Sequence, residues 1–377
     1  MKADLFIKYL EDLGADFFTG VPDSLLNSFC DSVYDRYNVS DKHIVAANEG
    51  AAVALAAGHY LATGRPAAVY MQNSGIGNAV NPICSLINRK VYSIPIVFVI
   101  GWRGEPGVHD EPQHLFQGEA TIPLLNCLEI PYFVLDRDTQ EDELTDAVHL
   151  FKSLIQAERS VAFVLKKNAL EKLPARSDRY QHPAQMSREQ AVSAIMDASS
   201  ENDIFVCTTG KLSREVFEYR TSHNQPHHKD FLTVGSMGHS CMIALGIAME
   251  NKKNRVFCLD GDGAMLMHMG SAVVAARYAP PSFVHVVINN GAHESVGGMP
   301  VAFGSSSLCE IARACGYKRT YRAQNKEELL RALSDVQGTD NGTAFIEVIC
   351  NLDVREDLGR PDIPPRTNKN QFMEHLK

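Results

Sequence analysis

The sequence lacks the features of several large classes of protein. No apolar run approaches the ~18 residues that a membrane-spanning helix needs, and the longest candidate, Ile94–Trp102, is typical of a buried strand. Acidic residues occur close to the N-terminus before any apolar signal core, so we expect no secretory signal. These absences predict a cytoplasmic protein that does not act on membranes.

Positive charge is also scarce, with 36 Lys and Arg against 45 Asp and Glu and a formal net charge of −9. This balance argues against nucleic acid as a partner. The nine cysteines show no CxxC spacing, which favours reduced thiols over disulfides or a zinc site. No GxGxxG motif follows an early strand, which disfavours a dinucleotide oxidoreductase.

The length of 377 residues indicates two domains of ordinary size. Short apolar strands alternate with helical patterns, which predicts the α/β class with two doubly wound parallel-sheet domains. We assign residues 1–170 to a first domain, 171–186 to a linker and 187–377 to a second domain that ends in an extended tail. The expected strands are Phe17–Thr19, Ala67–Met71, Ile96–Ile100, Tyr132–Leu135, Val161–Leu165, Ile204–Cys207, Val256–Leu259, His285–Ile288 and Ala344–Ile349.

The two halves of the chain resemble each other weakly. When the first half is shifted by 188 positions, Gly58 falls on Gly246 and Ser74 falls on Asp262. Each copy then contains an alanine-rich helix, a basic turn, an apolar strand and a glycine-containing turn. Either the chain contains a duplicated α/β domain, or two helix–turn–strand units simply look alike.

The strongest local signal is Val256–Gly263, which ends in Gly-Asp-Gly, followed by Val286–Asn290, which ends in Asn-Asn. Ligands of open α/β sheets bind where strands end. The glycines around Asp262 let the backbone approach a ligand, and the following helix offers N–H groups to a phosphate. Aspartate, asparagine and carbonyl oxygens suit a Mg²⁺ ion that also holds phosphate oxygens.

This paired motif resembles that of the thiamine-diphosphate decarboxylase family. The resemblance implies thiamine diphosphate and Mg²⁺ as cofactors, and domains of the thiamine-diphosphate-binding type. It implies that Asp262, Asn290 and the carbonyl of Ala292 bind the metal, with Asn289 the less favoured asparagine. The residues implied at the diphosphate are Gly261, Asp262, Gly263, Ala264 and Asn290.

Glu49 lies among small residues in Ala46–Ala52, which favours close packing over the alternative of a charged surface at a helix start. In the family, a glutamate in this setting contacts the cofactor's pyrimidine ring and promotes the tautomer that deprotonates the thiazolium carbon. Apolar packing should raise the pKa of Glu49 and aid this proton exchange. Met237 matches the apolar residue that bends the cofactor, and the carbonyl of Gly235 would accept its amino group.

Most of the family has a middle domain, and this chain has no segment for one. The compact form resembles the phosphonopyruvate and sulfopyruvate decarboxylases. The matching strings are Thr19–Ser24, Met71–Asn78, Gly101–Gly107, Asp110–His114 and Asn290–Gly298. This resemblance implies decarboxylation of 3-phosphonopyruvate to phosphonoacetaldehyde and CO₂, in phosphonate biosynthesis. Sulfopyruvate is the alternative substrate, and a non-catalytic subunit is the alternative of another class.

A small anionic 2-oxo acid needs several charge-assisted donors around it. The candidate substrate-binding residues are Ser24, Asn73, Ser74, Arg103 and Lys211, although both cations would also suit an ordinary surface. The candidate proton donors, besides the catalytic Glu49, are His109, His114 and His293. In the family the cofactor lies between two subunits, which implies a homodimer or larger with active sites at the subunit interface.

Overall fold

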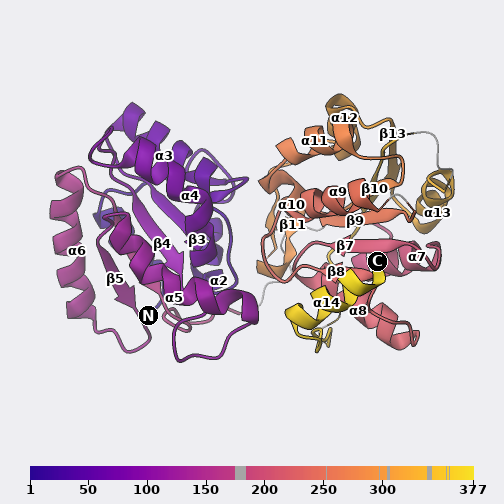
Figure 1. Cartoon of the computed structure of the whole chain (residues 1–377). Coiled ribbons are helices and arrows are strands. Elements are labelled where there is room, and N and C mark those ends of the chain that lie inside the picture. Colours follow the sequence, from indigo (N-terminus) through magenta and orange to yellow (C-terminus); the bar gives the residue numbers. More distant parts are fainter. Residues whose placement is uncertain are drawn as a thin grey trace. The chain divides into compact units, whose positions relative to one another are not determined.

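The computed structural model describes residues 1–174, 184–251, 253–296, 298–303, 306–337, 342–353, 355 and 357–377. These residues form two compact units (Figure 1). The first unit contains Met1–Ser177 and Val296–Ala302, and the second contains Asp178–Ser295 and Phe303–Lys377. Much of the expected linker, 171–186, lies outside the described residues, so the domain limits stay a prediction.

The first unit is built on a six-stranded sheet in the order β2-β1-β3-β4-β6-β5, and every pair of neighbours is parallel. Its strands are β1 (Phe18–Gly20), β2 (His43–Val45), β3 (Ala68–Gln72), β4 (Val97–Gly101), β5 (Tyr132–Leu135) and β6 (Val161–Leu165), with β12 (Met299–Pro300) apart from this sheet. Its helices are α1 (Ala3–Asp12), α2 (Asn27–Tyr37), α3 (Glu49–Thr63), α4 (Ile76–Pro82), α5 (Pro112–Cys127) and α6 (Glu141–Gln156), with short turns at η1 (Asn73–Gly75) and η2 (Ile83–Ile87).

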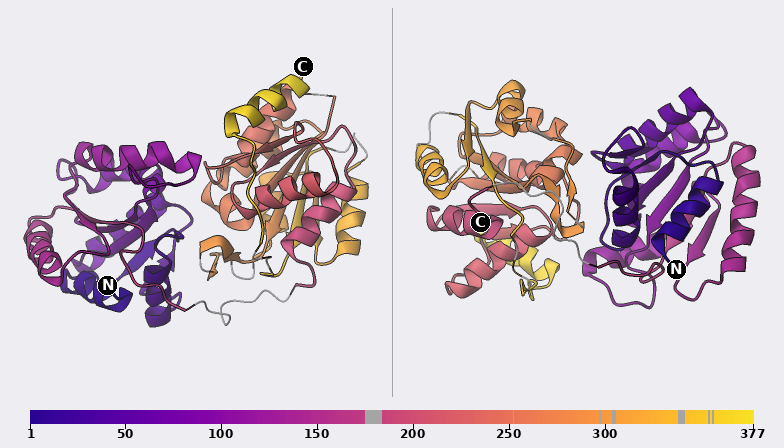
Figure 2. Two further views of the ribbon diagram at one scale, coloured as in Figure 1. Left: turned by 90° about the horizontal axis from the view of Figure 1, so that it is seen from below. Right: turned by 180° about the vertical axis from the view of Figure 1, so that it is seen from behind.

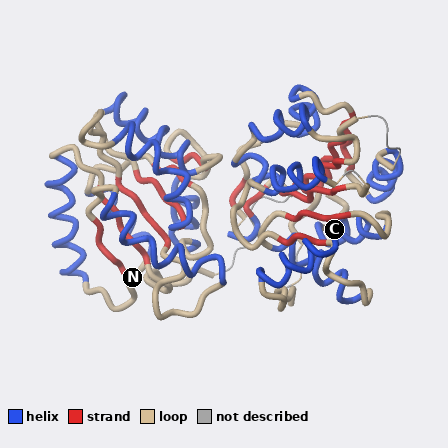
Figure 3. The backbone as a smooth tube through the Cα atoms, in the orientation of Figure 1, coloured by secondary structure: helices blue, strands red, loops and turns tan. Residues whose placement is uncertain are grey.

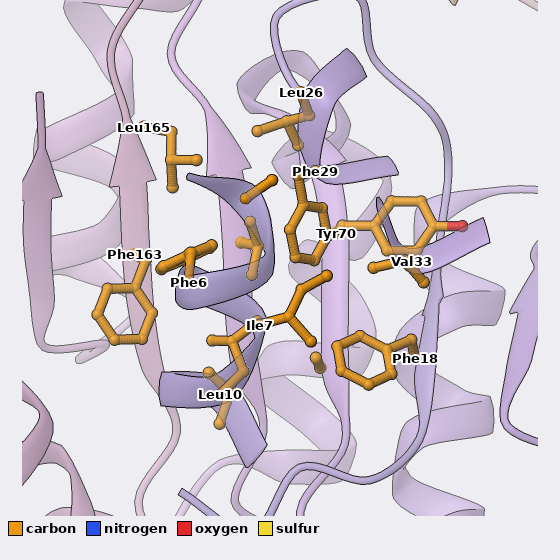
Figure 4. Close-up of a cluster of buried hydrophobic side chains, with 14 of the residues drawn as sticks. Phe6, Ile7, Leu10, Phe18, Leu26, Phe29, Val33, Tyr70, Phe163 and Leu165 are labelled. Atoms are coloured by element: carbon orange, nitrogen blue, oxygen red, sulfur yellow. The ribbon is translucent and has the colours of Figure 1, made fainter. Parts of the chain in front are cut away.

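Helices cover both faces of this sheet, so the strands are buried on both sides (Figures 2 and 3). Successive strand residues point to opposite faces, and this alternation divides the core in two. On one face, α1, α2 and α6 pack on Phe18, Tyr70 and Phe163 (Figure 4). On the other face, α3, α4 and α5 pack on residues such as Val69 and Phe98.

The second unit has its own six-stranded sheet in the order β13-β14-β10-β9-β7-β8, again with parallel neighbours. Its strands are β7 (Ile204–Cys207), β8 (Asp230–Leu232), β9 (Val256–Gly261), β10 (Phe283–Asn289), β11 (Ala292–His293), β13 (Arg319–Ala323) and β14 (Ala344–Ile349). Its helices are α7 (Arg188–Asp197), α8 (Lys211–Ser222), α9 (Ser240–Glu250), α10 (Asp262–Met267), α11 (Gly270–Tyr278), α12 (Leu308–Cys315), α13 (Lys326–Asp335) and α14 (Pro365–His375), with a turn at η3 (Glu294–Val296).

The two sheets share one topology. Numbering the strands of each main sheet from one to six along the chain, and leaving out the short β11 and β12, gives the order 2-1-3-4-6-5 in both. The predicted shift of 188 positions places Ala68, the first residue of β3, on Val256, the first residue of β9. The weak sequence repeat therefore has a counterpart in the fold.

The expected α/β class with two parallel sheets is confirmed, and all nine expected strands form within one or two residues of their expected limits. Only residues 166–187 separate β6 from α7, so this interval has no room for a middle domain. The edge strands β2, β8 and β13 were missed, because they are short or polar and carry a weak periodic signal. Among the described residues, none of the helices combines the length and apolar character that a membrane crossing needs.

The expectation of an extended tail was wrong in part. Residues Pro365–His375 form α14, which begins with a proline at the first helical position, where its missing N–H costs nothing. Phe372 is buried, and the Asn368 side chain donates to the carbonyl of Asp230 at 2.9 Å. These anchors hold the helix on β8.

Candidate active site

In the second unit, the two halves of the Gly-Asp-Gly and Asn-Asn motif end on neighbouring strands. Gly261, at the end of β9, pairs with Ile288 of β10. Parallel strands present their carboxyl ends at one edge of the sheet, so Asp262 and Asn290 leave the sheet together. The fold thus brings together two residues, Asp262 and Asn290, that 27 residues separate in the sequence.

Asp262 is a buried carboxylate held by backbone donors. Its Oδ1 accepts from the N–H of Gly263 at 2.6 Å, and its Oδ2 accepts from the N–H of Gly291 at 2.8 Å. Burial raises the pKa of Asp262 to about 7, despite these hydrogen bonds. The hydrogen bonds thus do not offset the cost of burying the charge. A buried carboxylate of this kind fits a site for a hard cation such as Mg²⁺, which would favour the ionised form.

The two asparagines differ in what their side chains contact. Asn289 is committed to the interior, because its Nδ2 donates to the buried carboxylate of Glu347 at 2.8 Å. The backbone of Asn290 hydrogen-bonds to Asp262, and the Asn290 Oδ1 accepts from the N–H of Ala292 at 3.2 Å. These contacts favour Asn290 over Asn289 as a metal ligand, as expected from the sequence, although its ligand role stays a proposal.

A bent loop brings Met237, and β11 brings His293, to the glycine after Asp262. Ser236 (φ 53°) and Gly238 (φ 88°) both adopt left-handed backbone conformations around Met237. A Cβ atom at Gly263 would lie 3.7 Å from the Met237 methyl carbon and 3.2 Å from Cε1 of His293. Burial lowers the pKa of His293 to about 4, so its imidazole is neutral near pH 7. The structure thus gathers Met237, Gly263 and His293 at one point.

The remaining expected residues of this unit have simpler surroundings. Gly235 lies half-buried in the Met237 loop, and Gly261 and Ala264 flank the turn at Asp262. Lys211, at the start of α8, donates to Glu294 at 2.7 Å, so its charge is already paired.

Glu294 is the centre of a charged network that the sequence did not predict. It accepts from Asn290 Nδ2 at 3.1 Å and from Lys211, and it pairs with Arg188. Arg188 also forms a bidentate pair with Glu215, with both distances at 2.8 Å. Glu294 lies four residues after Asn290, inside the string that matches the family, and that position was the available signal.

In the first unit, Glu49 begins α3 and is 5% exposed. Burial raises the pKa of its carboxyl group above the usual value, as expected, while the hydrogen bond from Asn78 opposes the rise. Asn78 Nδ2 donates to Glu49 Oε2 at 2.8 Å. The Glu49 side chain lies against Gly75, where a Cβ atom would be 2.6 Å from Glu49 Cδ. The contact with Asn78 was missed because nothing in the sequence ties these positions together.

A second polar cluster of this unit surrounds Arg103, which follows β4. Asp110 accepts from Arg103 Nε at 2.8 Å and from Nη2 at 2.5 Å, while Nη1 donates to Ser24 Oγ at 3.0 Å. Although burial opposes the change, hydrogen bonds from Arg103 and the Gly104 N–H lower the pKa of Asp110 to about 2. Asn73 Nδ2 donates to the carbonyl of Arg103 at 2.8 Å. Three expected residues, Ser24, Asn73 and Arg103, are therefore joined by hydrogen bonds.

Ser74 is linked to the neighbour of Ser24 by hydrogen bonds through Gln72 and Asp23, two residues that the sequence did not predict. Its hydroxyl donates to Gln72 Oε1 at 2.6 Å, and Gln72 Nε2 donates to Asp23 Oδ1 at 2.6 Å. Asp23 is 1% exposed, and burial raises the pKa of its carboxyl group. Asp23 and Gln72 precede Ser24 and Asn73 directly, inside the strings that match the family.

His109, in the loop between β4 and α5, and His114, in the first turn of α5, have different surroundings. His114 is half-buried, and both burial and the charge of Arg103 lower the pKa of its imidazole. His109 is exposed. The first turn of α5 therefore places His114 within reach of the charge of Arg103.

Comparisons with known proteins bear on both units. Residues 2–123 match the model of the thiamine pyrophosphate enzyme, N-terminal TPP binding domain, and residues 208–348 match that of the C-terminal TPP binding domain. Phosphonopyruvate decarboxylase of Streptomyces viridochromogenes is 31% identical over 98% of this chain and 93% of that protein. The chain belongs to the thiamine pyrophosphate enzyme family. The cofactor expected from the paired motif and from Glu49 is thus the cofactor of its family.

Other relatives in this family also align over nearly the whole chain. Phosphonopyruvate decarboxylase of Streptomyces hygroscopicus is 31% identical over 97% of this chain and 91% of that protein. Sulfopyruvate decarboxylase of Methanosarcina acetivorans is 25% identical over 98% of this chain and 96% of that protein. Both relatives are therefore close to this chain in length.

Proposed function

We propose that this chain is a thiamine-diphosphate- and Mg²⁺-dependent decarboxylase that converts 3-phosphonopyruvate to phosphonoacetaldehyde and CO₂. The observation that carries the proposal is the 31% identity to two phosphonopyruvate decarboxylases over almost the full chain. The polar cluster around Arg103 supports it, because an anionic substrate needs a cation in a protein whose net charge is negative.

The residues of each unit suit separate tasks in this reaction. Asp262, Asn290 and the carbonyl of Ala292 would hold Mg²⁺, and Gly261, Gly263 and Ala264 would line the diphosphate. Met237 and the Gly235 carbonyl would support the rest of the cofactor. When bound, thiamine diphosphate supplies an acidic carbon that accepts the electrons of the breaking C–C bond.

Glu49 would exchange a proton with the cofactor's pyrimidine ring. Its buried carboxyl group has a raised pKa, which favours a group that both gives and takes a proton near neutral pH. Asn78 holds Oε2 of the Glu49 carboxyl group, and this hydrogen bond also fixes the direction of Oε1.

Arg103 and Ser24 would bind the phosphonate. The bidentate pair with Asp110 fixes the plane of the guanidinium and leaves Nη1 directed toward Ser24. Asn73 and Ser74 hold the backbone and side chains of this cluster in place. His114 and His293 would serve proton transfer to the product, while Lys211 would act through its pair with Glu294.

Sulfopyruvate is the second candidate substrate, because a sulfopyruvate decarboxylase aligns over the same length at 25% identity. A coupled aldehyde assay with thiamine diphosphate and Mg²⁺ should compare phosphonopyruvate, sulfopyruvate and pyruvate. We expect the highest kcat/KM for phosphonopyruvate. A higher value for either of the other acids would overturn the substrate assignment, and no activity on any would favour a non-catalytic subunit.

We also propose that the enzyme is at least a homodimer whose sites combine the first unit of one subunit with the second unit of another. The division of the expected residues supports this, since Glu49 belongs to one unit and Asp262 to the other. Glu49→Gln and Asp262→Ala variants, each inactive alone, should regain activity when they are unfolded and refolded together. Mixed dimers then contain one site with both native residues. No recovery, with dimers formed, would place each site within one chain.

A further inference from the structure

A buried group of potential metal ligands lies on the face of the second sheet that α9 covers. Cys258 and Asp260 point to the same face because they are two residues apart on β9. His285, on the neighbouring strand β10, is the residue that pairs with Cys258. All three are at most 1% exposed. Their ligand atoms lie within 4.8 Å of one another. Strand pairing therefore creates a cluster without any CxxC spacing in the sequence.

The imidazole of His285 is only half satisfied. Its Nδ1 lies 2.9 Å from the Tyr317 hydroxyl, and this contact suits an Nδ1–H that donates to the phenol oxygen. Its Nε2 is buried and has no hydrogen-bond partner among the described residues. A buried nitrogen of this kind destabilises the folded state unless something binds it. A histidine that donates with Nδ1, while Nε2 faces a carboxylate without a hydrogen bond, has the arrangement found in metal-ligating histidines.

The spacing of His285 Nε2 and the Asp260 carboxylate is compatible with two ligands of one ion. Asp260 Oδ2 lies 3.6 Å from Nε2, too far for a hydrogen bond, while Asp260 Oδ1 accepts from the N–H of Gly261 at 2.9 Å. A metal about 2.1 Å from both atoms would span this gap at an angle of about 120°, near the tetrahedral value. The Cys258 sulfur, which lies within 4.8 Å of both atoms, would supply the third ligand.

We propose that Cys258, Asp260 and His285 form a second metal site, which takes one divalent cation of the zinc class. Thiolate, imidazole and carboxylate together suit zinc or cobalt and do not suit Mg²⁺, which prefers oxygen ligands alone. The site is distinct from the proposed Mg²⁺ site, whose ligands Asp262 and Asn290 include no sulfur. Because its residues join β9 to β10 beneath the Asp262 turn, the ion would stiffen the edge on which that turn is built.

Cobalt(II) tests the site, because a thiolate ligand gives an intense charge-transfer band in the near ultraviolet that an all-oxygen site does not give. Metal-free full-length protein should be loaded with saturating Mg²⁺ and then titrated with Co²⁺. We expect the thiolate band to saturate at one Co²⁺ per chain and to disappear when Zn²⁺ is added. Absence of this band in the native sequence would overturn the proposal, whatever the variants do.

Three variants test whether the band comes from this cluster. Cys258→Ser should abolish it, while Cys309→Ser should keep it, because Cys309 is a buried cysteine of the same unit whose sulfur contacts the Tyr321 carbonyl instead. His285→Gln should weaken Co²⁺ binding at least about tenfold without removing a sulfur. A band that persists in Cys258→Ser would also contradict the proposal. Catalytic activity is not needed for any of these readouts, so failure of the proposed function would leave them unchanged.

Discussion

Gly75 and Glu49 share one space, because the Glu49 carboxyl group lies where a side chain at position 75 would be. A Cβ atom at Gly75 would be 2.5 Å from Glu49 Cγ and 2.6 Å from Cδ. The backbone at Gly75 has an ordinary right-handed conformation (φ −70°), so the absence of a side chain, and not flexibility, is what this position requires.

Gly75→Ala should therefore displace Glu49 and lower kcat by at least about tenfold, because a misplaced catalytic group loses its proton-transfer geometry. Gly77→Ala is the matched control, since a Cβ atom there would meet nothing within 4 Å. Steady-state kinetics and thermal unfolding of both variants check the prediction. Equal kcat values for the two variants would contradict it.

Glu49→Gln should lower kcat by about 10²–10⁴-fold, because the amide keeps the shape but cannot exchange the proton. Thiamine diphosphate should still bind, and binding can be followed by calorimetry. Asn78→Ala removes the hydrogen bond that lowers the pKa of Glu49. It should therefore shift the acidic limb of the pH–rate profile to higher pH. Full activity of Glu49→Gln would remove Glu49 from the mechanism.

The neighbouring asparagines should respond differently to truncation. Asn290→Ala should raise the Mg²⁺ concentration needed for half-maximal activity and lower the melting temperature less than Asn289→Ala does, since Glu294 keeps Lys211 and Arg188 as partners. Asn289→Ala should instead destabilise the second unit by about 1–3 kcal/mol, because it removes the Asn289 donor from Oε1 of the buried Glu347 carboxylate. Magnesium titrations and urea unfolding of both variants separate the two roles. The opposite pattern would make Asn289 the metal ligand.

Arg103→Lys should reduce kcat/KM for phosphonopyruvate by about 10–100-fold, because a lysine cannot pair with Asp110 in a bidentate manner and also reach Ser24. Pyruvate has no anionic group on its third carbon, so its low kcat/KM should change much less. The ratio of the two values is the decisive measurement. A parallel loss with both substrates would assign Arg103 a structural role.

His43 should make the first unit sensitive to acid. It is fully buried, with Nδ1 at 2.7 Å from the Asn38 carbonyl and Nε2 at 2.8 Å from the Tyr70 hydroxyl. Burial lowers the pKa of its imidazole, so the unfolded chain binds a proton more readily than the folded one. Stability from this residue should be present above pH ~6.5, the pKa of an unperturbed histidine, and should fall as the pH drops below it.

Urea unfolding at pH 7.5 and pH 5.5 measures this effect. His43→Gln should reduce the difference between the two conditions, whereas His149→Gln, at an exposed histidine of α6, should not. An unchanged difference in His43→Gln would rule out this histidine as the cause.

The sequence by itself determined the class of fold, because apolar strands buried on both faces give continuous runs such as Val256–Leu259 that need no tertiary context. It also determined the cofactor family, because the chemistry of Asp262 and Asn290 sits in short strings. It could not reveal that Gly75 makes room for Glu49, that Asp110 fixes Arg103, or that Glu294 joins Asn290 to Lys211. Those relationships link positions on different elements, and only the order of strands in a sheet decides which elements become neighbours. For the same reason the cluster of Cys258, Asp260 and His285 exists only after β9 pairs with β10.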